Sequence, residues 1–390
     1  MITQAQIEGI RKQGNLRVAR ALSKVFGDIR NGVRIGELER FIADQDIDGM
    51  LAYLGIDEVA WQPLSEAIRD TYREGGEAAT RQLGPIQTKD HSFRARFNIR
   101  NPRAEQWLVN NSSTKVVEIV QQQRDMLRDV LDAAMVRGDN PRTTALEIVG
   151  RVNQATRKRE GGFIGLTRKQ SRWVINARNE LEIIHLQGEA RRKAILAMGR
   201  YPDTFDPLGS HRWRALRDRR GGGPVRAAFD PLESYLSRAL RDRRFDGAVR
   251  AAAESGKALN ANTLNNAIAR MQTRAERYRG TVIARTESLN ALRAGQWEAI
   301  EQAVEGNELS NADTIKVWDA SGDSRVREDH SEMDGQKRPV DEPFQFPDGS
   351  LGLYPGDSSL GAPANQTIQC RCKVRYEVDF FGRVMRAEGF

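Results

Sequence analysis

The chain has 390 residues, 29% of them charged, and carries a formal net charge of +8. Such a length is enough for two or three domains, each with its own core. No apolar run is long enough to cross a bilayer, and the first residues lack the basic start and apolar core of a signal peptide. We therefore expect a chain without a membrane span that folds in the cytoplasm.

The charge is unevenly distributed along the chain. Residues 281–390 contain 12 Lys+Arg and 19 Asp+Glu, whereas residues 1–280 contain 49 and 34. The basic surplus therefore lies in the first part, which predicts an arm that tolerates polyanions and an acidic C-terminal unit. A solvated helical surface is the alternative interpretation of scattered basic residues.

Residues 1–90 are predicted to form an N-terminal region of short helices, interrupted by glycines such as Gly32 and Gly49. Residues 91–200 are predicted to form a helical domain. Within it, alternating apolar residues over 93–99 indicate a short strand or an extended connector.

Three start signals divide this helical domain. Asn101-Pro102 and Asn140-Pro141 each combine an N-cap residue with proline at the first helical position. Thr167 and Gln170 have the spacing of a capping box, which predicts a third helix directly after Thr167.

Residues 201–255 contain a tandem repeat of 24 residues, with copies at 205–228 and 229–252. In the second copy, Asp230 is predicted to cap a helix that begins at Pro231. Its apolar residues are expected on one face, with arginines projecting outward. That face comprises Leu232, Tyr235, Leu236, Ala239 and Leu240, and the outward arginines are Arg238, Arg241 and Arg244.

The first copy departs from this pattern, because His211 and Arg212 replace Tyr235 and Leu236. Trp213 is then expected on the outward face beside arginines. Either this copy packs differently, or its arginines and Trp213 contact something other than solvent. The second interpretation is favoured, because an exposed tryptophan next to arginines is typical of a partner surface.

The repeat is also the best candidate for contact with nucleic acid, since arginines neutralise phosphates without reading bases. Asp218 and Asp242 lie inside the two arginine clusters and can pair with them, so a solvated helix face is the alternative. The candidate DNA-binding residues are Arg214, Arg217, Arg219, Arg220, Arg238, Arg241, Arg243 and Arg244.

The character of the chain changes after Gly306, where glycine, proline and aspartate become frequent. Residues 315–318 and 373–378 alternate as strands do. Residues 256–380 are predicted to form a small α+β domain, followed by a tail at 381–390. The predicted fold class is thus a mainly α N-terminal region followed by a small α+β C-terminal domain.

His330, Cys370 and Cys372 can supply three zinc ligands, with Asp323, Asp329 or water as the fourth. Cysteines separated by one residue form a disulfide only under strain, so both are expected to be reduced or metal-bound. The alternative is that they are small buried hydrophobes and that His330 is a hydrogen-bonded turn residue. A cysteine–histidine nucleophile is less favoured, because no oxyanion hole or orienting partner is evident.

A calcium loop is rejected, although Asp319, Ser321 and Asp323 occupy its first, third and fifth places. Ser324 replaces the required glycine, and His330 replaces the required glutamate.

Two further motifs are assigned structural roles. Arg285 and Glu287 lie in a helical context, where a structural ion pair is the more frequent arrangement. The segments 346–349 and 354–357 are turn-formers by composition and are expected to act as scaffold.

The C-terminal part resembles the phage Mu F-like head-morphogenesis (minor capsid) proteins over roughly residues 260–378. The matching residues are Ile283-Ala284-Arg285-Thr286-Glu287, Trp318, Asp323, Arg325-Val326-Arg327, Asp329-His330, Met333, Gly335-Gln336, Phe346, Gly349, Tyr354-Pro355-Gly356-Asp357 and Cys370-Arg371-Cys372. Segments near Asn101, Asn140 and Gly161 also look like tailed-phage relatives.

The resemblance implies a low-copy virion protein inside the phage head near the portal, made in the host cytoplasm. Such a protein would act in head assembly and in DNA packaging or delivery. Its expected partners are the portal protein, the major capsid protein or both, together with packaged double-stranded DNA, and residues 1–90 are a candidate docking region. The resemblance also implies metal binding by the histidine and the cysteine pair, and no established enzymatic activity.

A metal-dependent enzyme carried in the virion is the competing hypothesis. It would be a nuclease centred on Asp329 and His330, or a transferase that uses Arg285 and Glu287.

Overall fold

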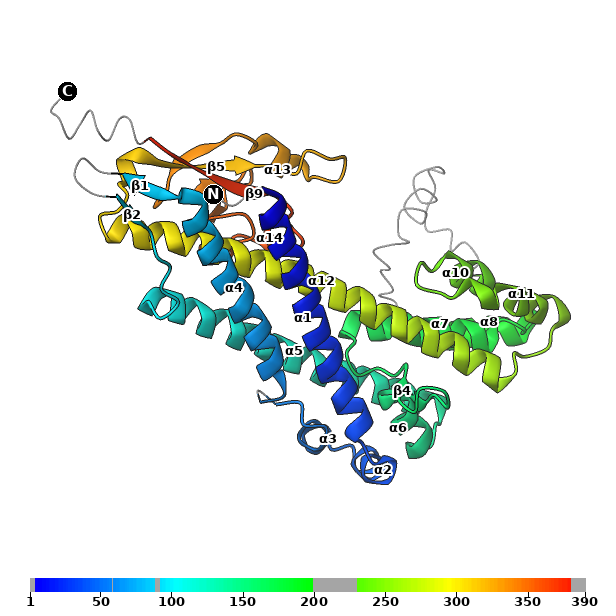
Figure 1. Ribbon diagram of the computed structural model, residues 1–390. Coiled ribbons are helices and arrows are strands. Elements are labelled where there is room, and N and C mark those ends of the chain that lie inside the picture. The colour runs from blue at the N-terminus through cyan, green and yellow to red at the C-terminus, as the bar shows by residue number, and fades with distance from the viewer. Residues whose placement is uncertain (1–3, 58, 88–91, 199–229, 380–390) are drawn as a thin grey trace. The chain divides into compact units, whose positions relative to one another are not determined.

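The computed structural model describes residues 4–57, 59–87, 92–198 and 230–379 (Figure 1). The chain forms two units, each assembled from separate stretches of sequence. Unit 1 consists of Met1–Val25, Glu58–Val116 and Gly280–Phe390, and unit 2 consists of Phe26–Asp57 and Val117–Arg279.

Most described elements are helices. The α-helices are α1 (Gln4–Gly32), α2 (Ile35–Ala43), α3 (Ile47–Tyr53), α4 (Gln62–Leu83), α5 (Pro102–Arg137), α6 (Pro141–Val149), α7 (Arg168–Ile183), α8 (Gly188–Met198), α10 (Pro231–Ser237), α11 (Asp246–Ser255), α12 (Ala261–Glu305), α13 (Glu328–Glu332) and α14 (Ala364–Thr367). Short 3-10 helices are η1 (Val59–Trp61), η2 (Arg243–Phe245) and η3 (Asn311–Asp313).

The strands are short and gather mainly in the C-terminal part. They are β1 (Pro85–Gln87), β2 (Ser92–Arg94), β3 (Arg151–Val152), β4 (Arg159–Glu160), β5 (Thr314–Asp319), β6 (Lys337–Pro339), β7 (Phe344–Gln345), β8 (Leu351–Gly352) and β9 (Lys373–Val378). The predicted fold class is confirmed, because helices dominate up to residue 305 and small antiparallel sheets follow.

The three predicted helix starts are confirmed. Proline is the first residue of both α5 and α6, and the Asn140 side chain accepts a hydrogen bond from the Thr143 N–H at 2.8 Å. Thr167 and Gln170 form the full capping box at the start of α7, with reciprocal hydrogen bonds of 3.2 and 3.0 Å. Each cap satisfies N–H groups that have no partner within the helix.

The N-terminal region differs from its prediction, because its glycines do not keep all helices short. Helix α1 runs for 29 residues and α4 for 22, each with glycines in its interior. A Cβ at Gly14 of α1 would lie 2.8 Å from Cγ2 of Thr71 on α4. This glycine therefore permits two helices to approach closely, which a single sequence does not distinguish from helix breaking.

Glycines likewise define where α4 crosses α12 in unit 1. A Cβ at Gly75 would lie 2.2 Å from the Leu292 carbonyl oxygen, and one at Gly295 would lie 2.0 Å from that of Tyr72. The two backbones touch at this crossing, so it anchors the middle of α12.

The C-terminal part of unit 1 is built on a three-stranded antiparallel sheet in the order β6-β5-β9. β9 pairs with β5 along its whole length, from Lys373 opposite Asp319 to Val378 opposite Thr314. Both strands lie where alternation predicted them. One apolar cluster includes Ile300 and Ala303 of α12 with Val340, and a second surrounds Trp318 on β5.

Unit 2 is a set of packed helices whose apolar interior also contains buried polar side chains. Its elements include α6 packed on α2, and α8 and α10 packed on α7. The buried Gln123 side chain accepts a hydrogen bond from the Gly165 N–H at 2.9 Å and donates one to the Leu166 carbonyl at 2.9 Å. Gly165 has a φ of +94°, a backbone conformation that favours glycine.

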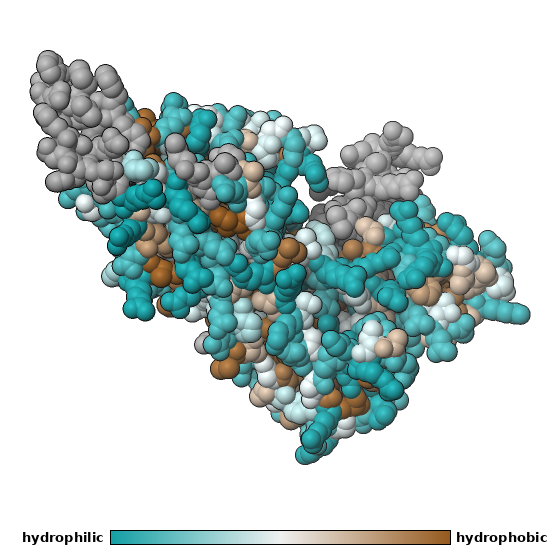
Figure 2. Space-filling view, viewed as in Figure 1, coloured by the Kyte–Doolittle hydropathy of each residue, from teal (hydrophilic) through white to brown (hydrophobic). Residues whose placement is uncertain are grey.

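The surface shown in Figure 2 is mainly hydrophilic, with hydrophobic residues in small separate patches. Among the described helices, none combines the length and the hydropathy needed to cross a membrane.

Candidate metal centre

Two segments of unit 1 bring His330, Cys370 and Cys372 together. His330 lies on the short helix α13, and the cysteines directly precede strand β9. The Nδ1 atom of His330 is 3.6 Å from Sγ of Cys370 and 3.4 Å from Sγ of Cys372. All three side chains are buried, with relative exposures of 1%, 2% and 1%.

The spacing of these atoms fits a tetrahedral metal ion. With Zn–S and Zn–N bonds of about 2.3 and 2.0 Å, tetrahedral angles place sulfur and nitrogen about 3.5 Å apart. The three donor atoms all lie within 4.8 Å of one another. Among the described residues, this is the group of histidine, cysteine and acidic side chains whose donor atoms are close enough to bind one metal ion. The cluster can therefore hold a metal, as the sequence predicted.

A further polar residue fixes the orientation of the imidazole. Gln366 on α14 is fully buried, and its amide nitrogen donates to Asp329 Oδ2 at 2.5 Å and to Asp348 Oδ2 at 2.9 Å. Because carboxylates only accept hydrogen bonds, the amide oxygen must face His330 Nε2, 3.0 Å away. The Nε2 atom then carries the proton, and the lone pair of Nδ1 points toward the two sulfurs.

Neither aspartate predicted as a fourth ligand occupies that place. Asp329 is engaged by Gln366, and Asp323 forms a two-pronged ion pair with Arg371. That pair, with the Arg325 N–H, holds the pKa of Asp323 well below its ordinary value. Neither carboxylate belongs to the group of donor atoms that lie within 4.8 Å of one another, so the identity of a fourth ligand, with water as the alternative, stays a prediction.

Aromatic rings enclose the cluster and limit its contact with water. Trp318 packs edge-on against His330 with ring centroids 5.5 Å apart, and it contacts Phe344 and Phe346 at 5.3 and 5.5 Å. Burial in such an apolar shell makes charged and polar groups costly unless they are paired.

The surroundings shift the pKa values of the two thiols in opposite directions. The hydrogen bond from Cys372, together with Arg293 and His330, lowers the pKa of Cys370, whereas the bond to Cys370 and burial raise the pKa of Cys372. Coordination of a metal by both sulfurs requires that both thiols lose their protons, since the thiolate is the ligand form.

Arg293 of α12 holds the loop that carries Cys370 and Cys372 through hydrogen bonds to backbone carbonyls. Its guanidinium donates to the carbonyl oxygens of Pro355 at 2.8 Å and Cys370 at 3.0 Å. A Cβ at Gly356 would lie 3.2 Å from Nη1 of Arg293, so glycine gives the arginine room to reach the turn. Thr286, seven residues earlier on the same helix face, accepts a hydrogen bond from the Gln369 N–H at 3.1 Å.

The motif around Arg285 has a structural part in this support, with partners other than those predicted. Arg285 donates to the Gln369 side chain at 3.3 Å, and the buried Glu287 pairs with Lys115 at 3.3 Å. The turn at 354–357 is also tied into unit 1, because the Tyr354 hydroxyl accepts a hydrogen bond from Trp107 Nε1 at 3.1 Å.

Sequence reasoning missed Gln366, Asp348 and Arg293. The only signal for Arg293 is its spacing of seven residues from Thr286, which places both on one face of a helix. No pattern marks Gln366, because its role depends on loops that meet only in the folded chain.

Residues 244–375 match the family described as Phage Mu protein F like protein, and they include the whole metal cluster. This part of the chain is similar to that family and is called the Mu F-like region below.

A curated relative matches part of the chain. It is the minor head protein GP7 of Bacillus phage SPP1, which is 33% identical over 96 residues. The match covers 25% of this chain and 29% of the relative, so the chain spans less than a third of that protein's length. No solved structure matches the chain significantly.

The arginines predicted to contact DNA lie mostly upstream of the Mu F-like region. Arg214, Arg217, Arg219 and Arg220, together with His211, Arg212 and Trp213, lie outside the described residues. In the second repeat copy, Asp230 caps α10 as predicted, with its side chain accepting from the Leu232 N–H at 3.0 Å.

The rest of the second copy departs from its predicted helix. α10 ends at Ser237, and Arg238 is extended, so Ala239 and Leu240 do not continue a helical face. Arg238 is buried and forms a two-pronged pair with the buried Glu180, at 2.6 and 2.7 Å. Its predicted outward projection is wrong, because a carboxylate on α7 draws it inward.

The other described arginines of the copy are closer to the surface. Arg241 is partly buried against Asp246, with a shortest distance of 3.1 Å. Arg244 is exposed and pairs with Asp242 at 2.6 Å, which lowers the pKa of Asp242 to about 2. Arg243 is also exposed. Local pairing with Asp242, which the sequence offered as the alternative to DNA contact, is therefore present.

Proposed function

We propose that the chain is a minor head protein of a tailed phage. The observation that carries this proposal is the Mu F-like region itself, supported by its likeness to a protein named as a minor head protein. We further propose that the chain lies inside the head near the portal, and acts in head assembly and in DNA packaging or delivery. Its partners would be the portal protein, the major capsid protein or both, and packaged double-stranded DNA.

We also propose that His330, Cys370 and Cys372 hold a zinc ion with a structural role. The near-complete burial of all three donors and the fixed His330 tautomer support a structural site. Zinc held by such donors contributes directly to the free energy of folding. Asp329, the residue that a nuclease would need near His330, is occupied by Gln366, which favours the structural role over the enzymatic alternative.

Metal analysis of the purified full chain tests the zinc proposal. We expect about one zinc per chain, and we expect His330→Ala to lose it together with thermal stability. His185→Ala is the matched control, because His185 lies outside the cluster, and it should retain the metal. A wild-type chain that takes up no zinc would contradict the proposal. If the wild type cleaved DNA and His330→Ala lost that cleavage while remaining folded, the enzymatic alternative would be favoured.

The position of the chain in intact particles tests the proposed role. We expect cross-links to the portal protein in purified heads. Particles that assemble and package DNA normally without the chain would contradict a role in morphogenesis.

A further inference from the structure

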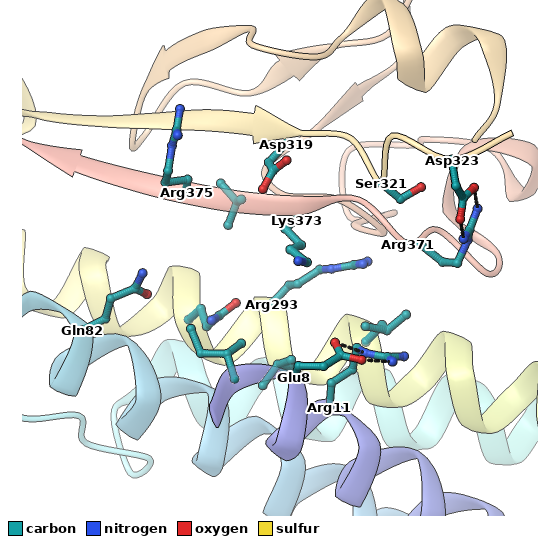
Figure 3. Close-up of a pocket in the computed structure, with 15 residues that line it drawn as sticks. Glu8, Arg11, Gln82, Arg293, Asp319, Ser321, Asp323, Arg371, Lys373 and Arg375 are labelled. Carbon is teal, nitrogen blue, oxygen red and sulfur yellow. Dashed lines mark hydrogen bonds and ion pairs between the residues drawn. The ribbon is translucent and has the colours of Figure 1, made fainter. Parts of the chain in front are cut away.

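A polar cleft of about 350 Å³ lies in unit 1, between strand β9 and helices α1, α4 and α12 (Figure 3). More cationic than acidic side chains line it. The cations are Arg11, Arg293, Arg371, Lys373 and Arg375, and the acids are Glu8, Asp319 and Asp323. Concave sites with an excess of one charge concentrate the electrostatic potential, so this cleft favours anions.

Two of the three acids form ion pairs with two of the cations, Arg11 and Arg371. A third cation, Arg375, pairs with Glu377 at 3.1 Å. Glu8 accepts from Nε of Arg11 at 2.6 Å, and Asp323 accepts from Nη2 of Arg371 at 2.6 Å. Asp319 is exposed on β5, opposite Lys373 in the strand register. Across the residues that the structure describes, no ion pair is formed by Lys373.

Arg293 is the unusual member of this set. Its side chain is nearly fully buried, with a residue exposure of 3%, and the acceptors of its hydrogen bonds are the two backbone carbonyls of Pro355 and Cys370. Within the described part of the chain, it has no ion pair with a carboxylate. Neutral carbonyls satisfy hydrogen bonds but do not balance the charge of a buried guanidinium, and the neighbouring sulfurs of Cys370 and Cys372 balance it only in part.

The cations converge on the same space. Figure 3 shows Lys373 and Arg293 extending into the gap between β9 and the helices, with Arg11 on the opposite wall. Burial, together with the charge of Arg11, lowers the pKa of Arg293. The hydrogen bond from Arg11, together with the charge of Lys373, lowers the pKa of Glu8.

Neutral groups complete a surface suited to an oxyanion. Gln82, Gln296 and Ser321 add hydrogen-bond donors, and Leu289, Leu292 and Val374 provide apolar wall. Apolar walls exclude water and strengthen charge interactions inside the cleft. We propose that this cleft binds an oxyanion, a phosphate or carboxylate group, between Lys373 and Arg293.

Isothermal titration of the full chain, at constant ionic strength, tests this site with pyrophosphate and with citrate as probes. We expect saturable binding of one molecule per chain. Lys373→Gln should weaken it about tenfold, because a charge-assisted bond is lost. Asp319→Asn should tighten it, because a repelling carboxylate is removed. Opposite shifts in the two variants do not arise from loss of folding.

Lys337→Gln is the matched control, since Lys337 is an exposed lysine of the same sheet that does not line the cleft. It should bind as the wild type does. Tighter binding of pyrophosphate identifies a phosphate ligand, and tighter binding of citrate identifies a carboxylate. Absence of saturable binding by both probes overturns the proposal, as does equal weakening by Lys337→Gln and Lys373→Gln.

Discussion

Gln366 shows how the geometry of the candidate metal centre depends on one residue outside the three donors. Its amide is held by two carboxylates and in turn holds the imidazole, so the lone pair of His330 faces the sulfurs. The hydrogen bond from Gln366 to Asp348 is the main reason that the pKa of Asp348 lies below its ordinary value. Partners of this kind typically change metal affinity by about 10–100-fold when they are mutated.

We therefore expect Gln366→Glu to weaken zinc binding within that range, because a third carboxylate would face Asp329 and Asp348. Adding Asp329→Asn and Asp348→Asn should restore affinity, since two amide donors would then hold a carboxylate that still accepts from His330. Competition for zinc with a chromogenic chelator measures the zinc affinity of each variant. Asp341→Asn is the control, because Asp341 is an exposed aspartate that does not contact Gln366. Failure of the triple variant to regain affinity would show that Gln366 only fills space.

At the scale of elements, the crossing of α4 and α12 positions the two α12 side chains that hold the loop carrying Cys370 and Cys372. Thr286 and Arg293 reach that loop from α12, and Gly295 lies two residues beyond Arg293 at the point where the two helices touch. The contact leaves no room for a methyl group, because the carbonyl of Tyr72 is rigid backbone.

Gly295→Ala should therefore lower the free energy of unfolding by about 1–3 kcal/mol, the usual cost of overpacking. Gly280→Ala on the same helix meets nothing within 4 Å, so it should stabilise by up to about 1 kcal/mol through helix propensity. Urea unfolding of both variants checks the pair. Equal effects of the two substitutions would argue that the crossing does not constrain α12.

At the scale of the whole molecule, the two units interleave along the chain. Helices α1, α5 and α12 each contribute residues to both units, whereas the sequence divides by composition into consecutive segments. Composition and charge change along the chain, but contacts between distant stretches decide which segments share a core.

The basic surplus of residues 1–280 predicts binding of the whole chain to duplex DNA that weakens steeply with added salt. Arg243→Gln with Arg244→Gln should weaken binding and reduce the salt slope by about one to two, since each phosphate contact contributes about one unit. Arg238→Gln should instead destabilise unit 2, because it leaves Glu180 buried without its partner. Fluorescence anisotropy from low to high salt measures the slope, and binding insensitive to salt would contradict a phosphate contact.

The sequence by itself determined the helix starts, the two alternating strands, the likeness of the C-terminal part to the Mu F-like family and the three candidate metal ligands. These features depend on helix caps, on the periodicity of apolar residues, and on histidine and cysteine, whose side chains are metal ligands in themselves. Only the tertiary structure decided that Asp323 and Asp329 have other partners, that Arg238 lies inside, and that Gln366 orients His330. Each depends on which distant carboxylate or amide comes within hydrogen-bond distance, and no spacing along the chain encodes that distance.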